Sequence, residues 1–364
     1  MRTAISKAAR APGERRSDLI ESLADEWDQL AARVGAGPFV RPGWFAAWWN
    51  AFGAGDLEIR TVRNDGRLTA VLPVARHRGA LRSLTNGHTP QFGILAENDG
   101  AAIGLAETIF REEPNRVSLA AMEPDGSSVK ACQVAAEDAG YRVAVRPFQR
   151  SPYLEIRETW REYESRLSRN LLDDLRKSQR RLSRCGKVFV DIHDGRERLP
   201  ELLADAFRVE ASSWKGTEGT AIQSHPETTH FYTDVAQWAV VKGMFRLFIL
   251  RLDQRPLAML YALDEDGICH FLKAGYDPEF ARFSPGKLLM RAAISYCFEG
   301  GRTKIEFHGH AEPYKLCWAS GVREQKRFEA FSYAPGAQAA WLTLAYARPL
   351  AGRVLRSFRR LARR

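Results

Sequence analysis

The residues most able to do chemistry gather between a strand-like run and a helical one. The run "CHFLKAGYD" is typical of a strand, and "KLLMRAAISYCFEGG" has the apolar spacing of a helix. Between them lies a turn that contains Pro285 and Gly286, followed by Lys287. The first amides of a helix have no partners within the helix and can hold an anion. We therefore expect the amides of Gly286, Lys287 and Leu288 to bind a phosphate, although an ordinary connecting turn would look similar.

A second group of polar residues follows on the run "TKIEFHGH". Side chains alternate along a strand, so Glu306 and His308 should share one face, where the carboxylate could tune the histidine as a base near neutral pH. His310 and Glu312 are alternatives in the next loop, and Lys315 could bind an acidic group of a substrate. Purely structural roles remain open for each residue. No further ligand accompanies the two histidines, so we expect no metal site.

The elements that must position these residues recur in the same order in both halves of the chain. Each half reads as consecutive strands followed by helix, strand, helix and strand, which indicates two α+β layers. We expect a disordered N-terminus at 1–17, a first domain at 18–150, a second domain at 151–335 and a basic amphipathic C-terminal helix at 336–364. A Pro-punctuated segment, "QRSPYLEI", marks the expected domain boundary.

Local signals place several elements more closely. An Asn-Asp-Gly turn at 64–66 predicts a β-hairpin. Thr159 and Glu162 have the spacing of a capping box, so a helix should begin there. We expect this basic helix to end at a glycine cap, Gly186. Three tryptophans of the run "PFVRPGWFAAWWNAFG" are expected to pack in a core, namely Trp44, Trp48 and Trp49.

Composition limits the class of protein. The chain has 364 residues, of which 45% are hydrophobic and 27% charged, which is typical of a soluble protein with two domains. Five cysteines occur without a CxxC pair, which argues against a disulfide framework and for a reducing compartment. Neither a secretory signal nor a long apolar segment is evident. We therefore expect a cytoplasmic protein.

The formal net charge of +10 is concentrated in two places. The segment 166–187 carries eight cations against Asp173 and Asp174, and the final segment 348–364 contains seven arginines and no acid. Such patches attract phosphorylated cofactors, nucleic acid or acidic lipid, although a solvated helix face is also common. In the final segment the apolar residues share one broad face, which is typical of peripheral association with a membrane surface.

Taken together, "HFLKAGYDPEFARFSPGKLLMRAAISYCFEGG" and "IEFHGHAEPYKLCWAS" resemble the acyltransferase half of the GNAT superfamily. More narrowly, the chain is similar to GNAT-like proteins of bacterial cellulose or exopolysaccharide biosynthesis, which are distant relatives of the Fem-type aminoacyl transferases. The best-matching pieces include "YDPEF", "SPGKLL" and "EASSWKG". The resemblance covers roughly residues 150–335. It implies an α+β fold of tandem GNAT-like domains, each a mixed central sheet flanked by helices.

The resemblance implies acyl transfer from acetyl-CoA or another acyl-CoA to an amine or hydroxyl of a small molecule, a sugar or an envelope precursor. In this superfamily the pyrophosphate of the cofactor rests on amides of the turn before the helix. The corresponding cofactor-binding residues here are Arg282, Phe283, Ser284, Gly286, Lys287 and Leu288. The turn departs from the usual glycine-rich pattern, since Pro285 lacks an amide proton.

The resemblance also implies roles in the reaction. Tyr314 stands where superfamily members often place the general acid that protonates the leaving thiolate. Glu306 and His308 are the candidates for the base, although relatives more often have aspartate at the position of Glu306. The expected substrate-binding residues are Trp214, Lys215, Tyr276 and Lys315. We expect the polar stretch 212–230 to line the acceptor side.

Two other functions fit the same residues. A Fem-like transferase would use aminoacyl-tRNA, with the basic helix at 166–187 as its footprint. Interleaved aromatics and RNA-binding motifs are missing, so we do not expect nucleic acid as a partner. A non-catalytic accessory protein of a polysaccharide synthase is the second alternative. The arginine-rich segment 348–364 would then hold it at the acidic inner face of the membrane.

Overall fold

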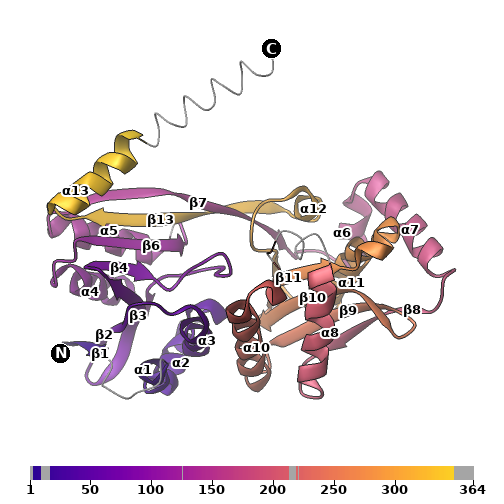
Figure 1. Cartoon of the computed structure of the whole chain (residues 1–364), viewed down its shortest axis with the longest axis horizontal. Coiled ribbons are helices and arrows are strands. Elements are labelled where there is room, and N and C mark those ends of the chain that lie inside the picture. The colour runs from indigo at the N-terminus through magenta and orange to yellow at the C-terminus, as the bar shows by residue number, and fades with distance from the viewer. Residues whose placement is uncertain (1–2, 10–16, 125, 213–218, 220, 348–364) are drawn as a thin grey trace, which may run out of the picture. The chain divides into compact units, whose positions relative to one another are not determined.

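The computed structural model describes residues 3–9, 17–124, 126–212, 219 and 221–347. The chain forms two compact units, and each is assembled from segments that are distant in sequence (Figure 1). Unit 1 consists of Met1–Val34, Gly53–Phe148 and Gln325–Arg364, and unit 2 consists of Gly35–Phe52 and Gln149–Glu324. This division differs from the two continuous ranges expected from the sequence. Segments 35–52 and 325–335 each group with the other half of the chain.

Unit 1 has a mixed sheet with helices packed on it. Its strands run in the order β1-β2-β3-β4-β6-β13-β7, and β5 pairs with β3. β4 and β6 pair in parallel, whereas the pairs β1–β2, β2–β3, β3–β4, β3–β5 and β6–β13 are antiparallel. The strands are β1 Thr3–Ala9, β2 Asp56–Asn64, β3 Arg67–His77, β4 Ala80–Ser83, β5 Leu95–Ala96, β6 Arg116–Met122, and parts of β7 Arg142–Glu155 and β13 Gly321–Phe331. The helices are α1 Asp18–Glu21, α2 Ala24–Arg33, α4 Asp99–Phe110, α5 Ser127–Asp138, α13 Pro335–Leu342 and η4 Thr343–Ala347.

The N-terminus corrects one expectation. Residues 1–17 were expected to be disordered, but β1 pairs antiparallel with β2 from Thr3↔Asn64 to Ala9↔Glu58. Pairing at a sheet edge uses backbone groups, which any sequence supplies, so the absence of apolar periodicity did not reveal the strand. The hairpin prediction is confirmed, because Asp65 and Gly66 join β2 to β3 with φ angles of 50° and 80°.

Unit 2 also has a mixed sheet, in the order β7-β12-β11-β10-β9-β8, with β11 and β12 parallel. Its further strands are β8 Val188–His193, β9 Phe245–Leu252, β10 Arg255–Glu265, β11 Ile268–Tyr276 and β12 Lys304–Glu306. Its helices are η1 Pro38–Val40, α3 Pro42–Phe52, α6 Trp160–Arg166, α7 Arg169–Leu182, α8 Leu199–Ser212, η2 Ile222–Ser224, α10 Pro226–Val241, η3 Pro278–Phe283, α11 Pro285–Glu299 and α12 Pro313–Leu316.

Alternation along β10 gives this sheet two buried faces. Leu260 and Ala262 belong to a core that residues of α7 and α11 complete. Tyr261 between them points to the other face, where its hydroxyl donates to the carbonyl of Tyr232 on α10 at 3.1 Å. Helices therefore cover both faces of the central strands, and the sheet is a rigid support for loops at its ends.

The segment expected to link the two domains is part of a strand. Residues 149–156 were interpreted as an extended linker, but β7 continues from Arg142 to Glu155 without a break. An extended linker and a strand have the same backbone conformation, and Pro147 and Pro152 made the segment resemble a linker. The unit boundary therefore falls inside one strand, between Phe148 and Gln149.

The predicted core role of the three tryptophans is confirmed, with 0%, 7% and 4% exposure for Trp44, Trp48 and Trp49. They lie on α3, which packs against α10 of unit 2. Trp44 contacts Phe231 edge-on with ring centroids 5.1 Å apart. Gly43 allows this approach, because a Cβ there would lie 2.1 Å from the indole nitrogen of Trp238.

The basic helical segment begins at the predicted capping box, but it ends before the predicted position at Gly186. Thr159 and Glu162 form the capping box of α6, and Ser168 caps α7. The helix was expected to end at the Cys185–Gly186 pair, but α7 ends at Leu182 with Ser183 as its C-cap. Among the described residues, every helix is too short or too polar to cross a membrane. The arginine-rich segment 348–364 lies outside the described residues.

Candidate active site

The candidate site of unit 2 forms where two parallel strands separate. β11 and β12 pair only at Ile268↔Lys304, Cys269↔Ile305 and His270↔Glu306. β12 ends at Glu306, whereas β11 continues to Tyr276. The amide of Phe307 donates to the carbonyl of Pro152 on β7 at 3.1 Å, so the chain turns away from β11. From Phe271 to Tyr276, β11 therefore no longer pairs with β12.

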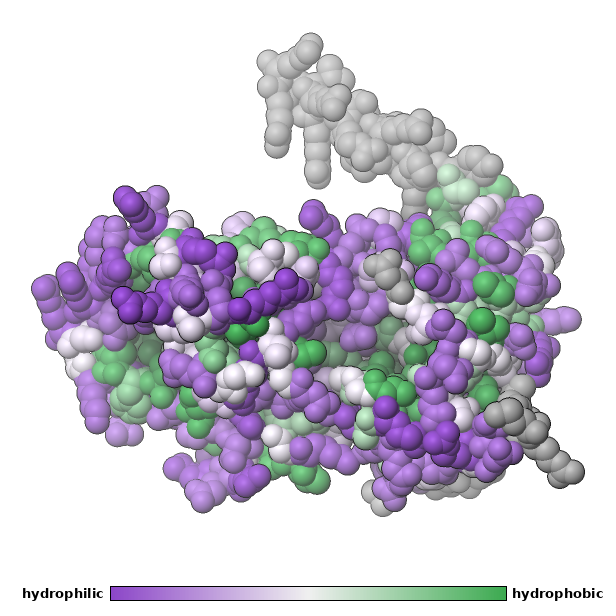
Figure 2. All heavy atoms as spheres, turned by 180° about the vertical axis from the view of Figure 1, so that it is seen from behind, coloured by the Kyte–Doolittle hydropathy of each residue, from purple (hydrophilic) through white to green (hydrophobic). Residues whose placement is uncertain are grey.

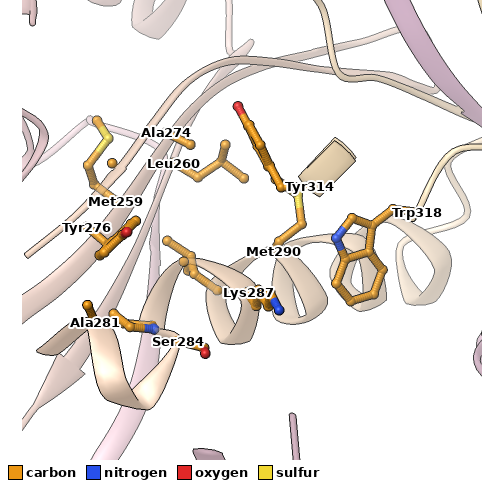
Figure 3. Close-up of a pocket in the computed structure, with 14 residues that line it drawn as sticks. Met259, Leu260, Ala274, Tyr276, Ala281, Ser284, Lys287, Met290, Tyr314 and Trp318 are labelled. Atoms are coloured by element: carbon orange, nitrogen blue, oxygen red, sulfur yellow. The ribbon is translucent and has the colours of Figure 1, made fainter. Parts of the chain in front are cut away.

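A pocket of about 330 Å³ lies beside this part of β11. Its wall is mainly apolar, and the larger apolar side chains are Met259, Leu260, Leu289, Met290 and Trp318. Its polar residues are Tyr276, Ser284, Lys287 and Tyr314. Figure 3 shows Tyr276 and Tyr314 on different sides of the pocket, with Lys287 and its helix, α11, along the lower side in this view. Such a pocket suits an apolar chain with a few polar groups.

The turn before α11 lines this pocket, but it offers fewer free amides than expected. Ser284 has a left-handed backbone, with φ and ψ both 48°, and it precedes Pro285. Its carbonyl accepts the amides of Lys287 at 3.0 Å and Leu288 at 3.1 Å. Of the three amides predicted to hold a phosphate, only that of Gly286 stays available. The prediction of a cradle of three amides is therefore wrong in this conformation.

Gly286 and Lys287 nevertheless line the pocket where α11 begins. A Cβ at Gly286 would approach the ring of Tyr276 to 3.3 Å, so glycine keeps this part of the pocket open. The N-terminus of α11 and the Lys287 ammonium both favour an anion here. The site combines one free amide, one cation and a helix dipole.

The other residues that were predicted to bind the cofactor pack in the core of unit 2 or shape the turn before α11. Phe283 and Leu288 are buried in the unit 2 core, with 6% exposure each. The guanidinium of Arg282 stacks over the ring of Phe283 at 4.8 Å. The amide of Ser284 donates to the carbonyl of Ala281 at 2.9 Å. These residues shape the turn, and only Ser284 among them lines the pocket.

Tyr314 reaches the pocket from the first turn of α12. Pro313 precedes it and fixes the helix start. Burial raises the pKa of the Tyr314 hydroxyl, and the carboxylate of Glu312 raises this pKa further. The hydroxyl therefore keeps its proton at neutral pH. The side chain is 45% exposed, so a molecule in the pocket can contact it.

The predicted pair of Glu306 and His308 is not formed. The Glu306 carboxylate is buried and forms ion pairs with Lys304 at 2.6 Å and with Arg323. In the described segment 304–310 no hydrogen bond joins Glu306 to His308. Strand alternation does not reach His308, because β12 ends at Glu306 and His308 has a left-handed φ of 48°. Neither residue lines the pocket.

His308 instead pairs with a second histidine. Its Nε2 lies 3.0 Å from Nδ1 of His270, and the ring of Phe39 packs edge-on against both imidazoles. Burial lowers the pKa of His308 to about 3, and the cations Arg323, Lys315 and Lys304 contribute in that order. A histidine with this pKa stays neutral and is a weak base near pH 7.

Two further predictions concern substrate binding. The ammonium of Lys315 donates to the carbonyls of His308 at 2.9 Å and His310 at 3.3 Å and pairs with Glu312 at 3.1 Å, and its role in substrate binding stays a prediction. These contacts hold the loop between β12 and α12. Trp214 and Lys215 lie outside the described residues, and their role stays a prediction.

The sequence reasoning missed the apolar wall of the pocket and one close contact beneath it. Met259, Leu260 and Trp318 have the spacing of ordinary core residues, so no sequence signal distinguished them. Gly275 of β11 also lines the pocket. A Cβ there would lie 2.6 Å from the Cα of Glu210 on α8, so glycine allows α8 to pack closely behind the pocket.

Comparison with known proteins finds one family model and several similar solved structures. Residues 169–316 match the family model of the acetyltransferase (GNAT) domain. None of the curated proteins compared with the chain matches it. Among solved structures, FemX is similar with a TM-score of 0.60 and 13% identity, covering 87% of this chain and 98% of that chain.

Two structures of another kind are similar as well. The C-terminal domain of a lysylphosphatidylglycerol synthetase from Agrobacterium fabrum has a TM-score of 0.56 and 11% identity, covering 89% of this chain and 97% of that one. L-PGS from Bacillus licheniformis has a TM-score of 0.54 and 11% identity, covering 88% of this chain and 94% of that one. At these identities the likeness shows a shared fold. Residues 169–316 have the GNAT fold, and the predicted α+β class with mixed sheets flanked by helices is confirmed.

Proposed function

We propose that unit 2 transfers an acyl group from acetyl-CoA, or another acyl-CoA, to an acceptor. One observation carries this proposal: a mainly apolar pocket opens where β11 and β12 separate, with Tyr314 on its wall and the Gly286–Lys287 turn at α11. An acyl thioester on an apolar arm fits the pocket, and phosphates of the same molecule fit the turn. The GNAT domain match over residues 169–316 supports the same reaction class.

In the proposed reaction the acceptor attacks the thioester carbonyl carbon while the acyl group lies in the pocket. The new bond forms at this carbon, the carbon–sulfur bond breaks, and the leaving thiolate takes a proton from Tyr314. Tyr314 is protonated at neutral pH and so has a proton to donate, although its raised pKa makes it a weaker acid than an ordinary tyrosine. General acids of this kind typically contribute about 10²- to 10⁴-fold to the rate.

The acceptor needs a way to lose its own proton. The predicted base, Glu306 with His308, gives little support here, because Glu306 is paired with two cations and the pKa of His308 is about 3. An amine in its free-base form attacks without prior proton removal; once the new bond has formed, the nitrogen loses a proton to solvent water, and the Tyr314 phenolate takes a proton back from water. A hydroxyl requires a base before it attacks. We therefore favour an amine acceptor.

The resemblance noted in the sequence suggests a source for that acceptor. We propose an amine of a sugar or of another envelope precursor, in the context of cellulose or exopolysaccharide biosynthesis. A Fem-like reaction with aminoacyl-tRNA is the second candidate. One observation favours it: α7 presents five cations that are exposed to solvent, namely Arg169, Arg176, Lys177, Arg180 and Arg181.

Calorimetric titration with acetyl-CoA and with desulfo-CoA tests the proposal without knowledge of the acceptor. We expect wild-type protein to bind both ligands with micromolar affinity. Gly286→Trp should abolish binding, because its side chain would enter the space beside Tyr276. Gly104→Trp is a matched control in a helix of unit 1, where a Cβ at Gly104 meets no atom within 4 Å.

Two results would count against the proposal. If wild-type protein bound neither ligand, the acyl-CoA reaction would be discarded, and salt-dependent binding of aminoacyl-tRNA would then be measured. If Gly286→Trp bound acetyl-CoA as well as wild type does, the pocket beside α11 would not be the donor site.

A further inference from the structure

The last described part of the chain is helical and has no charged residue. It consists of α13 and η4 and covers residues 335–347. A helix with so few polar side chains is usually buried in a core. Among the described residues of α13, however, only Ala337 is buried, and Trp341 packs against Phe331 of β13 with ring centroids 5.6 Å apart. One side of this apolar helix is therefore packed on unit 1 and the other side is uncovered.

The uncovered side of α13 follows helical spacing, so it forms one face. Its exposed residues are Pro335, Gly336, Ala339, Leu342 and, just after the helix, Thr343. Leu342 is 51% exposed, and Tyr333, just before the helix, is 67% exposed. Figure 2 shows green, hydrophobic surface at its upper right, where α13 lies. Uncovered apolar surface of this kind marks a place where another molecule or a membrane makes contact.

The hydrogen-bonding side chains of this segment have partners within the same part of the chain. The side-chain amide of Gln338 donates to the carbonyl of Ser332 at 2.6 Å. The hydroxyl of Thr343 donates to the carbonyl of Ala339 at 2.8 Å. An unpaired polar group is costly in an apolar environment, but these two groups would keep their hydrogen bonds there. The face is thus suited to leave water.

Positive charge accompanies this face both in the structure and in the sequence. The guanidinium of Arg142 lies 5.3 Å from the ring centre of Tyr333. After Glu329 the sequence contains seven arginines and no acid, and all seven belong to the segment 348–364, where apolar residues are interspersed among them. A bilayer surface with anionic headgroups offers partners for both kinds of side chain, whereas nucleic acid or an acidic peptide offers mainly negative charge.

We infer that the uncovered face of α13, with Tyr333 and Arg142, docks on the surface of a bilayer that contains anionic phospholipid. Leu342 would enter the boundary between headgroups and acyl chains, while tyrosine and arginine side chains keep their polar ends in water. The arginines of the segment 348–364 supply attraction to the headgroups, which salt weakens. Docking of this kind is independent of the proposed acyl transfer and requires no bound CoA.

Co-sedimentation with lipid vesicles compares a residue of this face with a matched control. Leu342→Asp places a charge on the uncovered face of α13. Val241→Asp places the same charge at the end of α10 in unit 2, where the valine is 83% exposed. Both side chains are exposed, so neither variant should unfold, and thermal melting checks this. Truncation after Ala347 removes the seven arginines and leaves α13 in place.

Wild type should bind vesicles of phosphatidylcholine that contain phosphatidylglycerol, and added salt should weaken this binding. We expect Leu342→Asp to bind these vesicles about tenfold more weakly, because it loses an apolar side chain and places a charge at the bilayer surface. Val241→Asp should bind as wild type does. The chain truncated after Ala347 should lose most of its affinity, because the attraction of its arginines to the headgroups is gone.

Tryptophan fluorescence tests whether α13 itself reaches the acyl chains. Brominated acyl chains quench tryptophan emission at short range, and Trp341 is the tryptophan of this helix. Phosphatidylglycerol vesicles that contain brominated lipid should quench part of the wild-type emission. Trp341→Phe keeps an aromatic ring against Phe331, so it should still bind the vesicles but lose this quenching.

Docking through α13 is overturned if wild type binds no vesicles, if Leu342→Asp binds them as wild type does, or if quenching persists in Trp341→Phe. RNA binding without vesicle binding would assign the arginines to nucleic acid. A wild-type dimer in analytical ultracentrifugation that Leu342→Asp dissociates, without vesicle binding, would assign the face to a second copy of the chain. Gly286→Trp should bind vesicles as wild type does, so a failure of the proposed acyl transfer remains distinguishable.

Discussion

Tyr314 is the single side chain on which the proposed chemistry depends most directly. Replacing it with phenylalanine removes the hydroxyl and retains the ring that lines the pocket. We expect Tyr314→Phe to lower the rate of CoA release by about 10²-fold or more, since general acids contribute about 10²- to 10⁴-fold. Binding of acetyl-CoA should stay within about twofold of wild type.

The measurement is thiol release during turnover with a panel of amines, together with calorimetric binding. Tyr333→Phe, an exposed tyrosine of unit 1, is the control and should behave as wild type. A Tyr314→Phe enzyme with an unchanged rate would show that the hydroxyl does not protonate the leaving group.

The histidine pair makes a separate prediction about pH. An unfolded histidine titrates near pH 6.5, whereas burial lowers the pKa of His308 to about 3 in the folded protein. Below about pH 6.5 the unfolded chain takes up a proton that the folded chain does not, so the stability of unit 2 falls as pH falls. Each such histidine contributes at most about 1.4 kcal/mol per pH unit to this slope.

His308→Asn removes the imidazole that takes up a proton in the unfolded chain. Asparagine tolerates the left-handed backbone at this position. The free energy of unfolding, measured in urea at several pH values below 6.5, should therefore depend less steeply on pH in the variant. His310→Asn, at an exposed position, controls for the loss of an imidazole. Parallel pH curves for wild type and His308→Asn would contradict the lowered pKa of His308.

At this scale the sequence predicted some site residues and not others. Gly286, Lys287, Tyr276 and Tyr314 were named, because a turn before a helix and a matching motif mark their positions. They do line one pocket. The Glu306–His308 pair failed because strand alternation applies only while a strand continues. The position where β12 ends depends on a hydrogen bond to β7, which lies far away in sequence.

At the scale of elements, the close packing of α8 on β11 supports the wall of the pocket. Gly275→Ala would place a methyl group 2.6 Å from the Cα of Glu210, and backbone atoms cannot move aside as a flexible side chain can. We expect a loss of about 1–3 kcal/mol in the free energy of unfolding. Gly104→Ala, with no atom within 4 Å of its Cβ, should instead be neutral or stabilise α4 by up to about 1 kcal/mol.

Denaturant unfolding followed by tryptophan fluorescence measures both variants. Equal stability of Gly275→Ala and wild type would show that α8 moves away from β11 at little cost. The contact between α8 and β11 would then tolerate more displacement than its short distance suggests. Binding of acetyl-CoA by Gly275→Ala should be measured to see whether the pocket keeps its shape.

Most elements follow from sequence patterns because their causes are local. The hairpin at Asp65–Gly66, the capping box of α6 and the three strands β9, β10 and β11 all appear where turn residues and apolar alternation place them. β1 and the continuous β7 were missed because pairing with other strands determines them, and such pairing leaves little trace in a single sequence.

At the scale of the whole molecule, the last strand belongs to the unit that begins the chain. The part of β13 from Gln325 onward pairs with β6 and buries Phe328 and Phe331 in unit 1, and Glu329 there accepts hydrogen bonds from Arg116 and Arg146. A chain truncated after Glu324 should therefore lose cooperative unfolding of unit 1, since a buried strand and its ion pairs are removed.

Truncation after Ala347 is the matched control, because it removes only residues outside the described part. Differential scanning calorimetry and limited proteolysis compare the two truncated chains. We expect the longer one to melt as the full chain does and the shorter one to be cut readily within unit 1. A normal melting curve for residues 1–324 would show that β13 is dispensable for unit 1.

The division into units was beyond sequence reasoning for a physical reason. Continuous domains were the natural expectation from the order of the elements, but packing assigns α3 to unit 2, where Trp44 lies against Phe231. The apolar face of α3 predicts that it is buried, and nothing in its residues says against which partner.

The chain passes between the units at four points, after Val34, Phe52, Phe148 and Glu324. This path has a consequence for synthesis on the ribosome, where proteins usually complete their N-terminal domain first. Here the strands of unit 1 emerge early, yet their sheet stays open until residue 331 has been made, after the whole of unit 2. During synthesis, β6 of unit 1 therefore has an unpaired edge until β13 emerges from the ribosome. A chaperone that covers this edge would protect the incomplete chain from aggregation.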